Sequence, residues 1–154
     1  MLLLEVAAAL KKSKIHFAIA GGYAVSLHGA VRGTVDVDIV LRFSKNDYIA
    51  AEAAFKNLGL TSRLPVSAAE VYEFREEYMK NRNLVAWSFS DPKDPTRIVD
   101  VIITHDLRKL GVEQVAADGR LLPVLAVPDL IAMKRASARP QDLEDVRALE
   151  ELRK

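Results

Sequence analysis

Residues 32–41 read Arg-Gly-Thr-Val-Asp-Val-Asp-Ile-Val-Leu and carry the most informative pattern of the chain. Polar and apolar residues alternate and then give way to an apolar run, which predicts a strand over 36–41. Residues two apart in a strand point to the same side, so Asp36 and Asp38 share one face, with Cα atoms about 6.6 Å apart. Val37 and Ile39 then face the core.

Aspartate is disfavoured in strands, so two aspartates on one strand face need a compensating partner. A divalent cation is one such partner, because carboxylate oxygens are the ligands that Mg²⁺ prefers. Two plainer arrangements also fit these residues: carboxylates solvated on a wet sheet face, or ion pairs with Arg32 or Arg42.

A third carboxylate lies in a later apolar segment. Residues 98–103 read Ile-Val-Asp-Val-Ile-Ile, and Asp100 is the only charge among them. An unpaired carboxylate would be costly in such a strand, and a metal shared with Asp36 and Asp38 would remove that cost. An edge-strand position or a buried salt bridge is the alternative.

Two adjacent glycines, Gly21 and Gly22, follow the apolar run of residues 16–20 and precede a short helical segment over 23–28. Glycines between a strand and a helix let the backbone approach a ligand closely, and free N–H groups at a helix start attract phosphate. The alternative is an ordinary tight turn. The pattern lacks the Gly-Lys-Ser/Thr ending of a Walker loop and is no Rossmann fingerprint.

Helices and strands alternate along the rest of the chain, which predicts a small α/β or α+β domain. Further helices are expected over 2–13, 45–58, 67–80, 128–136 and from about 140 onward. Strands are expected over 84–89 and 98–104, joined as a hairpin, and around the Asp118-Gly119 turn within 112–126. We expect one domain over 1–154, with a catalytic core over about 15–104 and a C-terminal part of strands and helices over about 105–154.

Composition bounds the chemistry. The chain has 154 residues, half of them apolar and 28% charged, with a net charge of +1 and no cysteine. This suits one globular domain and excludes a polybasic nucleic-acid binder, disulfides, thiolate nucleophiles and cysteine-ligated metals. The apolar N-terminus has helical spacing and lacks the basic start of a signal peptide, and no transmembrane helix is expected. The expected location is the cytoplasm.

Together these features resemble the nucleotidyltransferase superfamily of the DNA polymerase β type. The shared pattern is a strand, Gly21-Gly22, a short helix, Asp36-x-Asp38 and then Asp100 on a later strand. The Arg-x-Thr before the paired aspartates is similar to that of AbiEii-type toxins and small antibiotic nucleotidyltransferases. So is the C-terminal pattern, which consists of Lys134, Arg139, Asp142 and Asp145.

The resemblance implies a nucleotidyltransferase fold, a mixed β-sheet flanked by helices with the C-terminal helices packed on the core. It implies that Asp36, Asp38 and Asp100 bind two Mg²⁺ ions about 3.5–4 Å apart and catalyse nucleotidyl transfer from a nucleoside triphosphate such as ATP, with Asp100 as a candidate general base. It further implies that the phosphates are bound by Gly21, Gly22, Arg32, Thr34 and Lys134.

The remaining residues of interest have plainer interpretations. Lys134 on an apolar helix is ordinarily solvated, and only the family pattern favours a phosphate-binding role. Arg139, Asp142 and Asp145 are expected to hold the last two helices together. Two histidines, His28 and His105, lack a second histidine at ligand spacing and are read as structural or surface groups. An aromatic set is read as helix packing in preference to an acceptor groove, and it consists of Tyr72, Phe74 and Tyr78.

The leading hypothesis is transfer of a nucleoside monophosphate to a hydroxyl acceptor, which is an antibiotic-like small molecule, an RNA end such as that of tRNA, or a protein. An AbiEii-like toxin with a cognate antitoxin is one version. Because the chain is short, the acceptor site is expected to be shallow or completed by a homodimer or a partner. The rival hypotheses are a catalytically silent nucleotide-binding module of the same fold and a phosphohydrolase that uses the same carboxylates.

Overall fold

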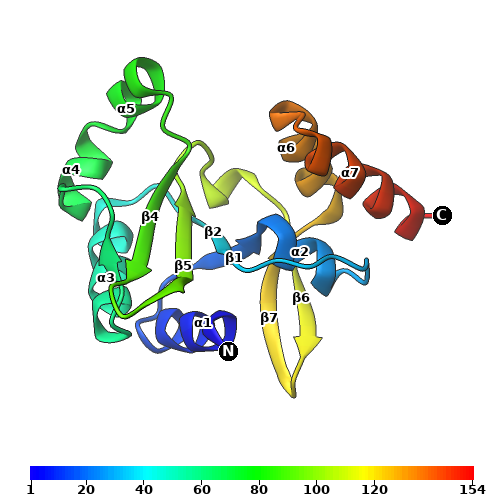
Figure 1. Cartoon of the computed structure of the whole chain (residues 1–154), viewed down its shortest axis with the longest axis horizontal. Helices are drawn as coiled ribbons and strands as arrows, with labels where there is room; N and C mark the ends of the chain where they lie inside the picture. The colour runs from blue at the N-terminus through cyan, green and yellow to red at the C-terminus, as the bar shows by residue number, and fades with distance from the viewer.

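A computed structural model describes all 154 residues and contains one mixed seven-stranded sheet with the order β3-β4-β5-β2-β1-β7-β6 (Figure 1). Two neighbouring pairs, β1–β7 and β2–β5, are parallel and the others are antiparallel. The strands are β1 (Phe17–Ala20), β2 (Val37–Leu41), β3 (Thr61–Ser62), β4 (Ala86–Asp91), β5 (Asp94–Ile102), β6 (Val112–Ala117) and β7 (Arg120–Leu125). The predicted fold class, a mixed sheet flanked by helices, is confirmed.

The helices surround this sheet and leave its central strands buried. They are α1 (Leu2–Lys12), α2 (Gly21–Leu27), α3 (Lys45–Asn57), α4 (Ala68–Glu73), α5 (Arg75–Arg82), α6 (Val127–Ser137) and α7 (Pro140–Leu152), with a 3₁₀ turn at Leu107–Lys109. All four residues of β1 are buried, so both faces of the sheet are covered there. None of the helices is long and apolar enough to cross a membrane.

The C-terminal helices α6 and α7 pack on each other beside α2, whereas α3, α4 and α5 lie toward the other edge of the sheet (Figure 1). Four buried residues of the C-terminal pair, Leu130, Ile131, Val146 and Leu149, belong to the same hydrophobic cluster as the central strands. The expected packing of the C-terminal helices on the core is therefore confirmed. This packing brings α6 and α7 close to the start of α2.

Two predicted helix boundaries are wrong. The helix expected over 67–80 is broken at Phe74, which ends α4 with φ −106° and ψ 18° and also precedes α5. The next residue, Arg75, turns inward, with its Nε donating to the carbonyl of Ile103 at 2.5 Å and its guanidinium over the Phe43 ring. The helix expected over 23–28 begins earlier, at Gly21, so both glycines belong to its first turn.

The strands differ in bounds and in number from those expected: β4 is shifted by two residues, β5 begins four residues earlier, and β3 is additional. The β4–β5 hairpin is confirmed, but its strands continue to Asp91 and resume at Asp94, with an irregular register at Ser90 and Asp91. The short edge strand β3 had no counterpart among the sequence predictions. The β6–β7 hairpin turns at Asp118 and Gly119, both with positive φ, as their residue types indicate.

Candidate active site

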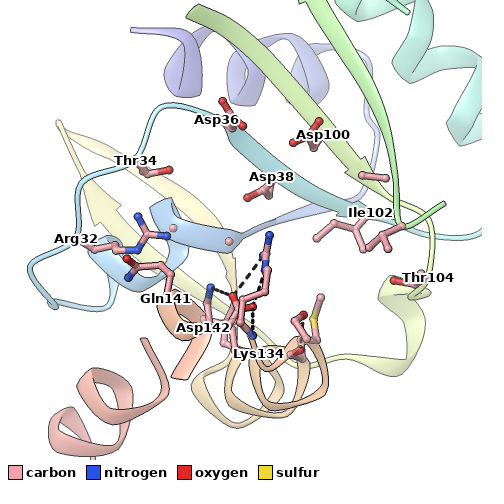
Figure 2. A pocket seen from close by; sticks show the side chains of 18 of the residues that line it. Arg32, Thr34, Asp36, Asp38, Asp100, Ile102, Thr104, Lys134, Gln141 and Asp142 are labelled. Carbon is pink, nitrogen blue, oxygen red and sulfur yellow. Dashed lines mark hydrogen bonds and ion pairs between the residues drawn. The ribbon is translucent and has the colours of Figure 1, made fainter. Parts of the chain in front are cut away.

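A cavity of about 700 Å³ lies between the central strands, α2, the loop over 30–36, and the two C-terminal helices. Eight residues were expected at the site from the sequence, and all of them line this cavity. They are Gly21, Gly22, Arg32, Thr34, Asp36, Asp38, Asp100 and Lys134. The structure thus brings together residues that are far apart in the chain, and Figure 2 shows their arrangement.

Asp38 and Asp100 form the centre of the cavity. They occupy directly opposed positions on the parallel strands β2 and β5, so their side chains emerge side by side from the same sheet face. Burial raises the pKa of Asp38 to about 7, and the adjacent charge of Asp100 and a hydrogen bond with it add to this effect. Burial and the neighbouring carboxylate therefore disfavour the ionised form of Asp38, and a bound cation would favour that form.

Asp36 lies just before β2 and lines the same cavity. Its pKa is also raised, first by burial and then by the charge of Asp100. In Figure 2 its side chain lies on the same side of the sheet as the Asp38–Asp100 pair. The alternation predicted from the sequence therefore does direct both aspartates of the 36–41 segment toward one site.

The start of α2 packs closely against the Asp38–Asp100 pair. Gly21 has a φ of +62°, and a Cβ atom at this position would overlap the Asp38 carboxylate. A Cβ atom on Gly22 would lie 2.8 Å from Oγ1 of Thr34. Glycine is therefore required at both positions for α2 to approach β2 and the loop over 30–36 this closely.

The wall opposite the sheet is a cluster of ion pairs, which we call the α6–α7 ion cluster. Lys134 of α6 lies 2.8 Å from Oδ2 of Asp145 and 3.7 Å from Oδ1 of Asp142, both on α7. Arg32 donates from Nε to Oδ1 of Asp145 at 3.0 Å, and Arg139 donates to Asp142 at 2.8 Å. The expectation that the two acidic residues hold the last helices together agrees with these contacts.

Two residues expected to bind phosphate are therefore partly neutralised. Lys134 and Arg32 both face Asp145, and Lys134 is nearly buried. Lys134 still acts on the carboxylate pair, because its charge opposes the rise in the pKa of Asp38. Its position makes it a fixed positive charge in the cavity wall, where the sequence alone favoured an exposed lysine.

The cavity differs in character from one side to the other. Figure 2 shows Arg32 and Gln141 on one side of the aspartates, and Ile102 and Thr104 on the other. Ile102 continues β5 beyond Asp100, and its strand partner Ala86 also lines the cavity. The site thus combines acidic groups at its centre with a polar side and a more apolar side.

A metal site must be tested against the donors present. No group of three or more acidic or histidine side chains in the structure is arranged to hold one metal ion between them. The adjacent pair Asp38 and Asp100, with Asp36 on the same cavity, nevertheless has the oxygen-only donor chemistry that suits Mg²⁺. The donor atoms of these residues therefore suit a divalent cation, which would bind between Asp38 and Asp100.

Several residues of the cavity were not expected there from the sequence. The approach of α7 brings Arg139, Gln141 and Asp142 to the cavity, whereas the C-terminal sequence pattern indicated only a link between the last two helices. His105 also lines it, with Nδ1 2.9 Å from Oγ1 of Thr104 and a pKa lowered by burial and by Arg75.

The other plain interpretations agree with the structure except at Phe74, which is 46% exposed at the break between α4 and α5. His28 is nearly buried and its Nε2 lies 2.8 Å from the carbonyl oxygen of Leu125. Tyr72 packs on Phe43, with ring centroids 4.5 Å apart. The expected aromatic set lies outside the cavity and consists of Tyr72, Phe74 and Tyr78.

Comparison with solved structures identifies the fold. The chain superposes on the antibiotic-resistance factor ANT(2'')-Ia with a TM-score of 0.67 at 12% identity, over 96% of this chain and 80% of that one. It superposes on the lincosamide antibiotic adenylyltransferase LnuA with a TM-score of 0.67 at 9% identity, over 98% and 96% of the chains. An antigenic nucleotidyltransferase-like protein from Paracoccidioides brasiliensis gives 0.61 at 14% identity, over 98% and 75%.

These similarities establish the nucleotidyltransferase fold. No protein-family model matches the chain, and no curated protein sequence matches it. At such low identity the fold is shared, and the activity has to be argued from the site itself.

Proposed function

We propose that the protein is a metal-dependent nucleotidyltransferase that moves a nucleoside monophosphate from a nucleoside triphosphate to a hydroxyl group. The observation that carries this proposal is the opposed pair Asp38 and Asp100, which lies in one cavity with the glycine turn that begins α2. A half-buried pair of adjacent carboxylates is poorly stable by itself, and one or two carboxylates are the donors that bind Mg²⁺ together with substrate phosphates.

The donors are assigned as follows. Asp38 and Asp100 would hold the divalent cation, and Asp36, which lines the same cavity, would be a further donor to it. Bound divalent cations neutralise the triphosphate and stabilise the charge that develops at the α-phosphate. Gly21 and Gly22 would lie against the phosphates, because the backbone of Gly21 packs on the Asp38 carboxylate and that of Gly22 lies beside Thr34 and Arg32. Thr34, beside Gly22, provides a hydroxyl group to the same region.

The reaction exchanges one bond for another. The acceptor oxygen attacks the α-phosphorus and forms the new O–P bond, while the bond between the α-phosphorus and its bridging oxygen breaks and pyrophosphate leaves. The acceptor proton passes to the carboxylate of Asp100, the general base of this proposal. Lys134 and Arg32 lie on the opposite wall, where their positive charges favour the polyanionic substrate.

ATP is the first nucleotide to test. LnuA is an adenylyltransferase, and ANT(2'')-Ia has been solved with adenylyl-2''-tobramycin. The acceptor belongs to one of three classes: an antibiotic-like small molecule, an RNA end such as that of tRNA, or a protein hydroxyl. Transfer to tRNA corresponds to an AbiEii-like toxin, whose acceptor site a homodimer or a cognate antitoxin would complete or cover.

The test is transfer of label from α-labelled ATP in Mg²⁺ to tobramycin, lincomycin, total tRNA or protein. Asp38→Asn and Asp100→Asn should reduce labelling to background, because each removes one carboxylate of the central pair. Asp118→Asn is the matched control, since it makes the same change at an exposed hairpin turn outside the cavity. Equal labelling by all three variants would contradict the site assignment.

A second candidate is a nucleotide-binding module without turnover. It is favoured by the absence of three acidic or histidine side chains arranged around one ion. Calorimetric titration with ATP and Mg²⁺, followed by an assay for released pyrophosphate, distinguishes the two. Binding without pyrophosphate release across all acceptor classes would favour the module, and release of phosphate without any acceptor would indicate a hydrolase.

A further inference from the structure

A row of side chains crosses three neighbouring strands beneath the cavity. Ser88 on β4 is opposite Asp100 on β5, and Asp100 is opposite Asp38 on β2. Directly opposed residues point to the same sheet face, so the serine hydroxyl and the two carboxylates lie side by side in register. Ser88 is absent from the residues that line the cavity, so it contacts the site only through this row.

Ser88 holds one oxygen of Asp100. Its Oγ donates to Oδ1 of Asp100 at 2.5 Å, within the short range of hydrogen bonds to ionised carboxylates. Apart from Asp38, no other side chain hydrogen-bonds to Asp100. This bond anchors Oδ1 of Asp100 from β4, on the side of β5 opposite to Asp38.

Asp38, at the other end of this row, is also in contact with a neighbouring element. A Cβ atom on Gly21 would overlap the Asp38 carboxylate, so this carboxylate packs directly against the backbone at the start of α2. Two adjacent ionised carboxylates repel each other, and the side chains of Asp38 and Asp100 would rotate apart if nothing restrained them. The serine on one flank and the glycine backbone on the other keep the two carboxylates adjacent.

We infer that Ser88 is a positioning residue that holds Asp100 in the orientation needed to bind a divalent cation together with Asp38. The inference rests on the proposed function, because it gives a role to a residue that would act through one of the proposed metal ligands. Hydrogen-bond partners behind a ligating carboxylate typically change metal affinity or activity by about 10–100-fold when they are removed.

The test compares three variants by Mn²⁺ binding, measured calorimetrically in the presence of a non-hydrolysable ATP analogue. Ser88→Ala should raise the dissociation constant for Mn²⁺ by about 10–100-fold. Ser88→Thr keeps the hydroxyl group and should restore most of the affinity. Ser90→Ala is the matched control, because Ser90 lies two residues further along β4, is also half-buried and makes no side-chain hydrogen bond. It should stay within about twofold of the unsubstituted protein.

A second measurement separates positioning from simple support of the strand. Urea unfolding in EDTA reports how much stability each variant loses without metal. If Ser88 only supports β4, Ser88→Ala will unfold at lower urea but bind Mn²⁺ like Ser90→Ala, and that result would overturn the inference. If the unsubstituted protein binds Mn²⁺ and transfers label while Ser88→Ala binds equally well, only this inference fails. Absence of both Mn²⁺ binding and label transfer in the unsubstituted protein overturns the proposed function and the role of Ser88 with it.

Discussion

Lys134 and Asp145 form an ion pair across α6 and α7, with Nζ 2.8 Å from Oδ2 and both side chains at most 10% exposed. Asp145 also accepts hydrogen bonds from Arg32 and from Gln141. One carboxylate of α7 therefore fixes a lysine of the cavity wall and an arginine of the loop that precedes Asp36. The geometry of the cavity depends on this contact as much as on the sheet.

Removing the Asp145 charge should destabilise the protein strongly. Asp145→Asn leaves the ammonium group of Lys134 buried without its closest counter-charge, and breaking such a buried pair typically costs about 3–5 kcal/mol. Urea unfolding measures the loss. Glu150→Gln is the control, because Glu150 pairs with Arg135 at 2.6 Å on the surface, where such a pair contributes about 1 kcal/mol or less. Equal losses of unfolding free energy in the two variants would show that the α6–α7 ion cluster stabilises the protein no more than a surface ion pair does.

Gly21, at the start of α2, should not tolerate alanine because of a steric clash. A second glycine, Gly119, separates the effect of that clash from the effect of backbone strain. Gly21 and Gly119 both have positive φ, so alanine at either position should lose about 1 kcal/mol through backbone strain. At Gly119 no atom lies within 4 Å of the new Cβ, whereas at Gly21 that atom meets the Asp38 carboxylate. Gly21→Ala should therefore also lose Mn²⁺ and ATP binding, measured by calorimetry, and Gly119→Ala should retain both.

Stability without metal should depend on pH through Asp38. Its pKa is about 7 in the folded protein and about 3.9 in an unfolded chain, so the folded state holds the proton more tightly. The associated stability is fully present below about pH 4 and is lost as the pH rises through about 7. In EDTA at pH 8, Asp38→Asn should therefore be more stable than the unsubstituted protein, by an amount on the order of 2–4 kcal/mol.

Unfolding curves recorded from pH 4 to pH 8 test this dependence. The advantage of Asp38→Asn should shrink toward pH 4, where the carboxyl of the unsubstituted protein is protonated. Asp118→Asn provides the comparison, because its side chain is exposed in the β6–β7 turn. A stability difference for Asp38→Asn that is constant across the pH range would refute the electrostatic origin.

Divalent cations should offset much of the stability that the metal-free protein loses through the Asp38 carboxylate. Mn²⁺ or Mg²⁺ at about 100 times its dissociation constant should stabilise the unsubstituted protein by about 2.7 kcal/mol, which corresponds to a rise of about 5–10 °C in Tm for a domain of this size. Thermal unfolding with and without EDTA measures the effect. The double variant Asp38→Asn with Asp100→Asn should show no such rise, and an equal rise in that variant would place the cation elsewhere.

The central part of the site was predictable because its signals are local. The alternation around Asp36 and Asp38 and the isolated charge of Asp100 need only the period of a strand to be read. The structure places all three on one cavity, as expected for a shared site. Their binding of a metal remains a prediction.

The supporting residues were not predictable, because they depend on register and on distant packing. Ser88 faces Asp100 only in the register that the β4–β5 hairpin adopts, and that hairpin has an irregularity at Ser90 and Asp91 which its turn sequence does not reveal. The partner of Arg32 and Lys134 is Asp145, which the approach of α7 brings to the loop over 30–36. The sequence therefore identified the two positively charged side chains, Arg32 and Lys134, but not Asp145 as their partner.

The parallel pairing of β2 with β5 also has a kinetic consequence. Between these strands the chain forms α3, β3, α4, α5 and β4, so a long loop must close before Asp38 and Asp100 meet. Contacts across such loops tend to form late in folding, and interactions missing from the transition state act mainly on the unfolding rate. We therefore expect the carboxylate repulsion to leave the refolding rate almost unchanged and to shorten the lifetime of the folded, metal-free protein.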